Sequence, residues 1–269
     1  MVKVIKAIDY VKEHGDTIEK NRLNCILLNT PATTSIKNKL KKMQNPDGGF
    51  SYWTKEFSTV SDTIYILSWL DDLQIHTGKI VDYAFDFLIS HQQPDGGWDE
   101  VGAMEDAGKS SDIIPGEVET RAFLTAYCAH WFVRFGRAEP PEARGCPMEF
   151  LKTCRKPSGL ILDDLQATWD SLVLFSFYPG ATSQLFNDTL EVIEKKFSPD
   201  TWKGSKVAYL LCCLRDSGLE AYHPFVNLCT DELIQKQQED GSWESEYGAK
   251  HATDATISAL RVLKHYNVV

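Results

Sequence analysis

A seven-residue motif that turns the chain and recurs along it is the strongest guide to the fold. It reads Gln-Gln-Pro-Asp-Gly-Gly-Trp at Gln92–Trp98, with close relatives at Gln44–Phe50 and Gln237–Trp243. The first two copies start 48 residues apart, and the third starts 145 residues later, close to three times 48. This spacing predicts two degraded copies in between, at Arg155–Ile161 and Lys196–Trp202. A repeat of this period indicates an array of similar supersecondary units.

Each copy lies between two helical patterns of different polarity. The helix before it is amphipathic, as at 79–90, whereas the helix after it is apolar over most of its circumference, as at 119–132. A sixth pair is predicted at the N-terminus, with 4–14 as its outer helix and 19–28 as its inner helix. Six helical hairpins whose first member meets the last predict an all-α fold, an α6/α6 toroid with a central cavity, formed as one domain over residues 1–269.

The motif itself has a structural interpretation. Gln at the end of the outer helix is expected to hydrogen-bond terminal backbone groups, and Pro-Asp-Gly-Gly is expected to turn the chain with Gly at positive φ. The aromatic residue then fills the gap between neighbouring hairpins. These residues therefore identify the architecture and carry no chemistry.

Composition narrows the class of protein. The net charge of -10 excludes a phosphate-backbone partner, because nonspecific nucleic-acid binding needs a surplus of Lys and Arg. The seven cysteines are scattered, lack a CxxC pair and lie mostly in apolar runs, which favours a cytoplasmic protein. No run approaches the roughly 18 apolar residues of a membrane span. These features do not exclude peripheral contact with a membrane surface.

The three well-kept motifs, each followed by an apolar inner helix, resemble the repeats of squalene-hopene and oxidosqualene cyclases and of the β subunits of protein prenyltransferases. The resemblance covers nearly the whole chain and is specific for the superfamily. It implies an α6/α6 toroid whose aromatic-lined cavity holds an isoprenoid. Such a cavity is physically reasonable, since apolar walls bury a hydrocarbon and ring faces stabilise a carbocation.

The chemical signatures of that superfamily are incomplete here. Alkene-protonating cyclases carry Asp-x-Asp-Asp before a Thr, and the aligned stretch of this chain has Thr59, Ser61 and Asp62, so only the last acid is kept. Protein prenyltransferases hold zinc through Asp-x-Cys and a His. No Cys of this chain has Asp two residues before it, and Asp254 is closer than His251 to the position of that His. Zinc is therefore not expected, and no residue is assigned to a metal.

Four acids on the inner helices align at one expected position, and they are the candidate catalytic residues: Asp62, Glu119, Asp170 and Asp254. Asp62 and Asp170 are the strongest of the four. Carboxylates around one mouth of a cavity can hold a divalent cation such as Mg²⁺, or shift one another's pKa. The alternative is that they complement helix dipoles and cap free N–H groups, worth about 0.3–1 kcal/mol each. A polar stretch at 100–119 is expected to form a loop over the same mouth.

Five further residues are candidates for substrate binding. Lys203 and Lys206 resemble the basic pair that holds a prenyl diphosphate in protein prenyltransferases, and Tyr65, Phe123 and Trp169 are the aromatic residues expected to face the cavity. The remaining aromatics are interpreted as core, and His130, His223 and His265 are interpreted as solvated or core residues.

The sequence thus favours an isoprenoid-handling enzyme with a terpene cyclase-like or prenyltransferase-like activity. A non-catalytic toroid that binds an isoprenoid or a partner subunit remains the main alternative, because the acid and zinc signatures are missing. A carbohydrate-active α/α toroid, which also uses carboxylate pairs, is a third alternative. Fold alone does not choose among them.

Overall fold

The computed structural model describes residues 2–103, 113–138 and 145–269, and these residues are helical apart from turns, loops and isolated β-bridges. Within the polar loop expected at 100–119, residues 104–112 lie outside the described part. The described residues divide into two compact units. The first comprises Met1–Lys37, Asp72–Gln74 and Lys196–Val269, and the second comprises Asn38–Asp71 and Ile75–Lys195.

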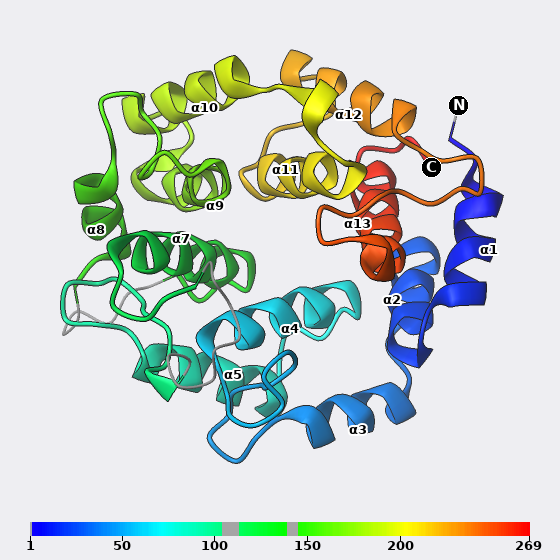
Figure 1. The fold of residues 1–269 in the computed structure, drawn as a ribbon, viewed down its shortest axis with the longest axis horizontal. Helices are drawn as coiled ribbons and strands as arrows, with labels where there is room; N and C mark the ends of the chain where they lie inside the picture. The colour runs from blue at the N-terminus through cyan, green and yellow to red at the C-terminus, as the bar shows by residue number, and fades with distance from the viewer. Residues whose placement is uncertain (1, 104–112, 139–144) are drawn as a thin grey trace. The chain divides into compact units, whose positions relative to one another are not determined.

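The first unit joins the two ends of the sequence (Figure 1). Its helices are α1 (Val4–His14), α2 (Thr17–Leu28), α11 (Gly204–Asp216), α12 (Pro224–Gln235) and α13 (Ala252–His265), with short 3-10 turns at Pro199–Thr201 and Ala249–His251. The apolar α13 packs against α11, α2 and α1. A contact between the first and last hairpins, which the repeat predicted, is therefore present inside this unit.

The second unit contains the middle of the chain. Its helices are α3 (Thr34–Met43), α4 (Val60–Asp72), α5 (Lys79–Ser90), α7 (Val118–Arg134), α8 (Pro147–Cys154), α9 (Leu165–Phe175) and α10 (Gln184–Lys196), and α3, α4 and α10 each have one end in the first unit. The inner helices α7 and α9 pack along each other. Most of α9 is buried, whereas most of α3 is exposed to solvent, which follows from the width of their apolar stripes.

One predicted inner helix is shifted along the chain. The sequence pattern placed it at 170–178, but α9 starts at Leu165 and ends at Phe175. It starts early because the side chain of Asp164 accepts the backbone N–H of Ala167 and caps the first turn. Its α-helical part ends before Pro179, which leaves Tyr178 extended at φ -145° and ψ 121°.

The repeated motif folds as the sequence predicted. In the three well-kept copies the Gln side chain donates to the carbonyl of the glycine four residues later, at Gly48, Gly96 and Gly241. The same amide groups reach the start of the next outer helix in two copies: Gln44 donates to the carbonyl of Ile80, and Gln237 to that of Lys3. The Gln therefore ties the end of one outer helix to the beginning of the next.

The glycines of the motif are required for two reasons. Gly241 has φ 93°, and a Cβ there would lie 2.5 Å from the backbone nitrogen of Ala7 in α1. Gly48 has φ 92°, and its Cβ would lie 2.3 Å from the carbonyl oxygen of Tyr83 in α5. The turn thus lies directly against the backbone of the next outer helix, which only glycine allows. The aromatic residue that follows is buried, and the indole N–H of Trp98 and Trp243 donates to an outer-helix carbonyl.

Candidate functional site

A recurring threonine hydrogen bond sets the true register of the inner helices. In four repeats the backbone N–H of the motif's last residue donates to a Thr hydroxyl, which in turn donates to the carbonyl four residues earlier in its own helix. The four threonines are Thr63, Thr125, Thr168 and Thr256. This bond holds each inner helix at a fixed height against its turn, so it defines equivalent positions.

Against this register the four candidate acids are not equivalent. Asp62 precedes its Thr by one residue and Asp254 precedes its Thr by two, whereas Glu119 lies six residues before its Thr and Asp170 lies two residues after its Thr. The expectation that all four share one position was therefore wrong. The expectation assumed that every acid stands in the first helical turn, but α9 starts five residues before Asp170 and has no acid in that turn.

Asp62 is a buried acid that holds a loop. It stands in the first turn of α4, and its side chain is almost fully buried. Its Oδ2 accepts the backbone N–H of Trp53 at 3.1 Å, and the hydroxyl oxygen of Thr54 lies 3.5 Å from it. Its backbone N–H donates to Thr59 Oγ1 at 3.0 Å. A carboxylate that accepts N–H groups from a neighbouring loop fixes the shape of that loop.

Burial raises the pKa of Asp62, and the charge of Glu100 raises it further, while the hydrogen bonds from Trp53, Thr54 and Thr59 act in the opposite direction. Glu100 is buried as well, and its two oxygens accept the N–H groups of Val60 and Ser61 at 2.7 and 3.0 Å. It caps α4 and complements the dipole of that helix. Nothing in the repeat pattern singled out Glu100.

Four aromatic rings meet beside Asp62. Tyr65 and Trp69 lie four residues apart on one face of α4, with ring centroids 5.4 Å apart. Tyr52 and Trp53 come from the loop before α4. The Tyr52 ring lies 4.9 Å from Trp69, and the Trp53 ring lies 5.6 Å from Tyr65. Trp69 is buried, Tyr52 and Tyr65 are half-buried, and Trp53 is 49% exposed, so the cluster presents ring surface to its surroundings.

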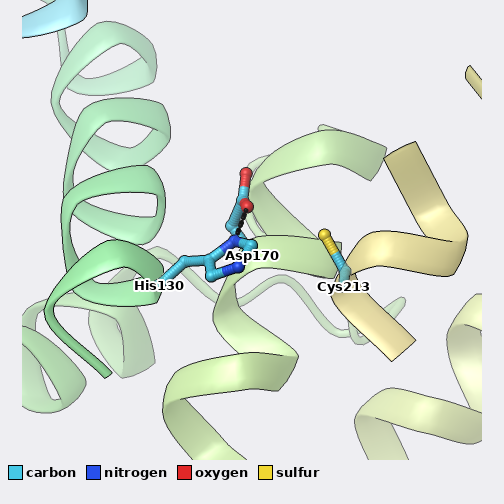
Figure 2. A group of neighbouring side chains, drawn as sticks. All are labelled: His130, Asp170 and Cys213. Atoms are coloured by element: carbon cyan, nitrogen blue, oxygen red, sulfur yellow. Dashed lines mark hydrogen bonds and ion pairs between the residues drawn. The ribbon is translucent and has the colours of Figure 1, made fainter. Parts of the chain in front are cut away.

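Asp170 forms a buried pair with His130, which Figure 2 shows. Asp170 Oδ1 lies 2.7 Å from His130 Nδ1, and the side chains are 0% and 1% exposed. The pair joins α9 to α7, and the ring of Trp131 stacks on that of His130. Two titratable groups in contact without solvent hold a proton between them or carry opposite charges. The interpretation of His130 as an ordinary core residue missed this partner.

The two remaining acids have different surroundings. Glu119 is exposed in the first turn of α7. Asp254 is bound by Arg22 at 2.7 Å, and Arg22 also binds Asp72 at 2.8 Å. Arg261 binds the other oxygen of Asp72 at 2.9 Å, so Asp72, which belongs to the first unit, joins Arg22 of α2 to Arg261 of α13. Asp254 is therefore part of a buried charge network that supports packing.

The two candidate lysines are engaged by the chain's own groups. Lys203 Nζ lies 3.8 Å from a carboxylate oxygen of Glu244, and the backbone N–H of Lys203 donates to Glu246 at 2.7 Å. The ammonium group of Lys206 lies 5.0 Å from the centroid of the Trp202 ring, a cation–π contact. The carboxylates of Glu244 and Glu246 beside Lys203 would repel a diphosphate.

The other aromatic candidates differ in accessibility. Phe123 is half-buried on α7 and lies 5.7 Å from Tyr127 by ring centroid. Trp169 is 1% exposed, which leaves almost no accessible ring surface.

A polar hollow also lies in the second unit, where Arg121 binds Asp95 at 2.7 Å. It is lined by Gln93, Pro94, Asp95, Asp99, Gly116 and Arg121, and is open to solvent.

Known structures resemble this fold over nearly its whole length. A type II terpene cyclase, MstE from Scytonema, solved with its product merosterolic acid A, matches with a TM-score of 0.65 and 13% identity over 99% of this chain and 96% of that chain. MstE solved with its substrate geranylgeranyl dihydroxybenzoate matches with a TM-score of 0.63 and 13% identity, covering 98% and 96%. A protein from Actinoplanes matches with a TM-score of 0.68 and 13% identity, covering 98% of each chain.

These matches show the fold. The chain has the all-α fold of type II terpene cyclases, and the predicted fold class, an α/α toroid, is confirmed. No protein-family model and no curated protein sequence matches the chain. In the part of the chain that the structure describes, none of the helices is both long and apolar enough to pass through a bilayer.

Proposed function

We propose that the protein binds an isoprenoid chain and cyclises it, as an enzyme of the terpene cyclase type. The observation that carries this proposal is the fold shared over 98–99% of the chain with MstE, a type II terpene cyclase solved with a prenylated substrate and with its product. At an identity of 12–14%, the substrate of this chain has to be inferred from its own residues rather than from these structures.

The aromatic cluster beside α4 supports the proposal chemically. Three rings with accessible surface, those of Tyr52, Trp53 and Tyr65, provide apolar area for a hydrocarbon, and ring faces stabilise positive charge. Cyclisation of a polyene passes through carbocations, so this environment favours the reacting state over the resting hydrocarbon.

The buried Asp170–His130 pair is the candidate source of the proton. Transfer of a proton to an alkene forms a C–H bond from the π electrons and leaves a tertiary carbocation. Ring closure consumes further double bonds, and loss of a proton from the last cation returns the proton to the enzyme, so substrate and product are isomers. A carboxyl group removed from water beside an imidazole fits this task, because the imidazole is a base that can exchange a proton with the carboxyl group across their hydrogen bond.

A non-catalytic binding protein is the second candidate. It is favoured by the engagement of Asp62 with the loop and of Asp254 with Arg22, which leaves fewer carboxylates for chemistry. Prenyl transfer from a diphosphate receives less support, because Glu244 and Glu246 occupy the surroundings of Lys203.

Incubation with squalene, geranylgeraniol and geranylgeranyl diphosphate, with and without Mg²⁺, tests the proposal. The expected result is a cyclic product of the same mass as its substrate, detected by gas chromatography and mass spectrometry, and lost in Asp170→Asn. Binding of a prenyl chain without turnover would select the binding protein. Neither binding nor turnover with any of the three would reject an isoprenoid function.

A further inference from the structure

The loop before α4 is built as a separate unit on the aromatic face of that helix. Residues 51–57, called the flap from here on, leave the motif at Phe50 and return at Thr59. The two ends are joined by the Thr59 N–H, which donates to the Phe50 carbonyl at 3.1 Å. Inside the flap the hydroxyl of Thr54 donates to the carbonyl of Phe57 at 2.8 Å. The flap is therefore a closed loop whose base is fixed to the repeat.

The middle of the flap is bound to Asp62. The backbone N–H of Trp53, near its tip, donates to one oxygen of this carboxylate at 3.1 Å, and the Thr54 oxygen lies 3.5 Å from the same atom. These bonds bring the rings of Tyr52 and Trp53 back onto the α4 face formed by Tyr65 and Trp69. Thr54 itself is 4% exposed, whereas Trp53 is 49% exposed, so the anchor is covered and the indole is available.

We propose that the flap is a wall of the isoprenoid site, that Trp53 contacts the prenyl chain, and that Asp62 is a positioning residue rather than the acid. This inference rests on the proposed function. Asp62 acts through the loop backbone, because a carboxylate whose oxygen already accepts an N–H group near 3 Å holds the Trp53 main chain in place. The ring is thereby preorganised against α4, which lowers the entropic cost of binding a flexible chain.

The seven tryptophans of the chain make the flap measurable. Trp53 is 49% exposed, while the other six are at most 8% exposed, namely Trp69, Trp98, Trp131, Trp169, Trp202 and Trp243. Quenching of fluorescence by acrylamide therefore reports mainly on Trp53. Trp53→Phe is expected to remove most of the quenchable emission, which verifies the assignment before any ligand is added.

Removal of the anchor is the direct test. Asp62→Ala is expected to raise the quenching constant of Trp53 at least twofold, while Asp62→Asn, which keeps an oxygen to accept the Trp53 N–H, is expected to restore the wild-type value. Asp164→Asn is the matched control, because Asp164 caps α9 with a similar bond to Ala167. Circular dichroism establishes that each variant is folded. Equal quenching in wild type and Asp62→Ala would overturn the role of Asp62.

Geranylgeraniol is the ligand probe. It is expected to protect Trp53 from acrylamide in the wild type, and to bind at least tenfold more weakly to Asp62→Ala than to Asp62→Asn. Binding that leaves Trp53 unprotected, or equal affinity for the two variants, would show that the flap is not part of the site. If geranylgeraniol, squalene and geranylgeranyl diphosphate all fail to bind the wild type, the proposed function fails, while the ligand-free quenching still decides whether Asp62 holds the flap.

Discussion

At the scale of single residues, Asp170 illustrates the energetic consequence of a buried titratable pair. Asp170→Asn replaces the carboxyl group that faces His130 at 2.7 Å in a place without solvent. Breaking such a pair costs about 3–5 kcal/mol, because the remaining partner keeps its desolvation penalty. We expect a loss of about 3 kcal/mol in the free energy of unfolding, measured by urea denaturation, together with loss of turnover.

Asp254→Asn is the control for that measurement. The Asp254 side chain is 28% exposed, and its partner Arg22 keeps Asp72. The expected loss is about 1 kcal/mol, the size of an ordinary hydrogen bond. A loss in Asp170→Asn no larger than that in Asp254→Asn would contradict the view that the Asp170–His130 bond is a buried charge pair.

The raised pKa of Asp62 predicts in which direction the stability of the protein changes with pH. Burial raises its pKa above the ordinary 3.8, so the folded protein binds the proton more tightly than the unfolded chain does. The resulting stabilisation is complete below pH 3.8 and is lost as the pH rises through the raised pKa of the folded state. The unfolding free energy of wild type minus that of Asp62→Asn should therefore fall as the pH rises above 3.8.

Asp240 provides a control of opposite sign. Burial alone would raise its pKa, but the N–H and hydroxyl of Ser242 outweigh burial and lower it. The advantage of wild type over Asp240→Asn should therefore be present above the ordinary pKa of 3.8 and decrease as the pH falls through the lowered value. The stability advantage of wild type over Asp62→Asn and that over Asp240→Asn should change with pH in opposite directions. A change in the same direction would refute the assignment of the Asp62 pKa shift to burial.

At the scale of elements, the turn of the repeated motif packs against α1. Substitution of Gly241 in this turn, with Gly248 as the control, measures how much that packing contributes to stability. Gly241 and Gly248 have φ values of 93° and 94°, but an added Cβ meets the α1 backbone at Gly241 and meets nothing within 4 Å at Gly248. Both Ala variants suffer backbone strain of about 1–3 kcal/mol, because a residue with a Cβ is disfavoured at positive φ. Gly241→Ala should lose about 2 kcal/mol more, because overpacking forces α1 to move. Equal losses of unfolding free energy in the two variants, measured by urea denaturation, would show that the packing of the turn against α1 does not contribute to stability.

The elements also show what the sequence can and cannot predict. The period of the motif and the polarity of its flanking helices predicted the hairpins, and the bounds of outer helices such as Lys79–Ser90 followed from the apolar stripe. The register of the inner helices did not follow, because Asp164 caps α9 early and Thr168 fixes its height. These are side-chain bonds that no hydrophobic period encodes.

The candidate site was predictable in part for the same reason. Asp62 and Tyr65 were found because they lie on one inner helix next to the motif. His130 was missed because its partner is 40 residues away, and periodicity carries no information on such a pairing. Trp53 was missed because it belongs to a loop, where its contact with Tyr65 depends on the fold of the flap. The anchor of that loop, Asp62, was assigned a chemical role from its position alone.

At the scale of the molecule, the first unit makes stability depend on contacts between the two ends of the sequence. Lys3 and Gln237 exchange backbone and side-chain hydrogen bonds across 234 positions, and Ala7 and Val11 of α1 are fully buried. Deletion of α1 should therefore remove the protection of its partner α13 in hydrogen exchange followed by mass spectrometry, while α7 and α9 of the second unit stay protected.

The double variant Ala7→Ser/Val11→Ser should reproduce the pattern more weakly, since it keeps the helix but buries two hydroxyls. Protection lost equally from α13, α7 and α9 would mean that the two units unfold as one cooperative body, and protection retained in α13 would mean that α1 contributes nothing to the first unit.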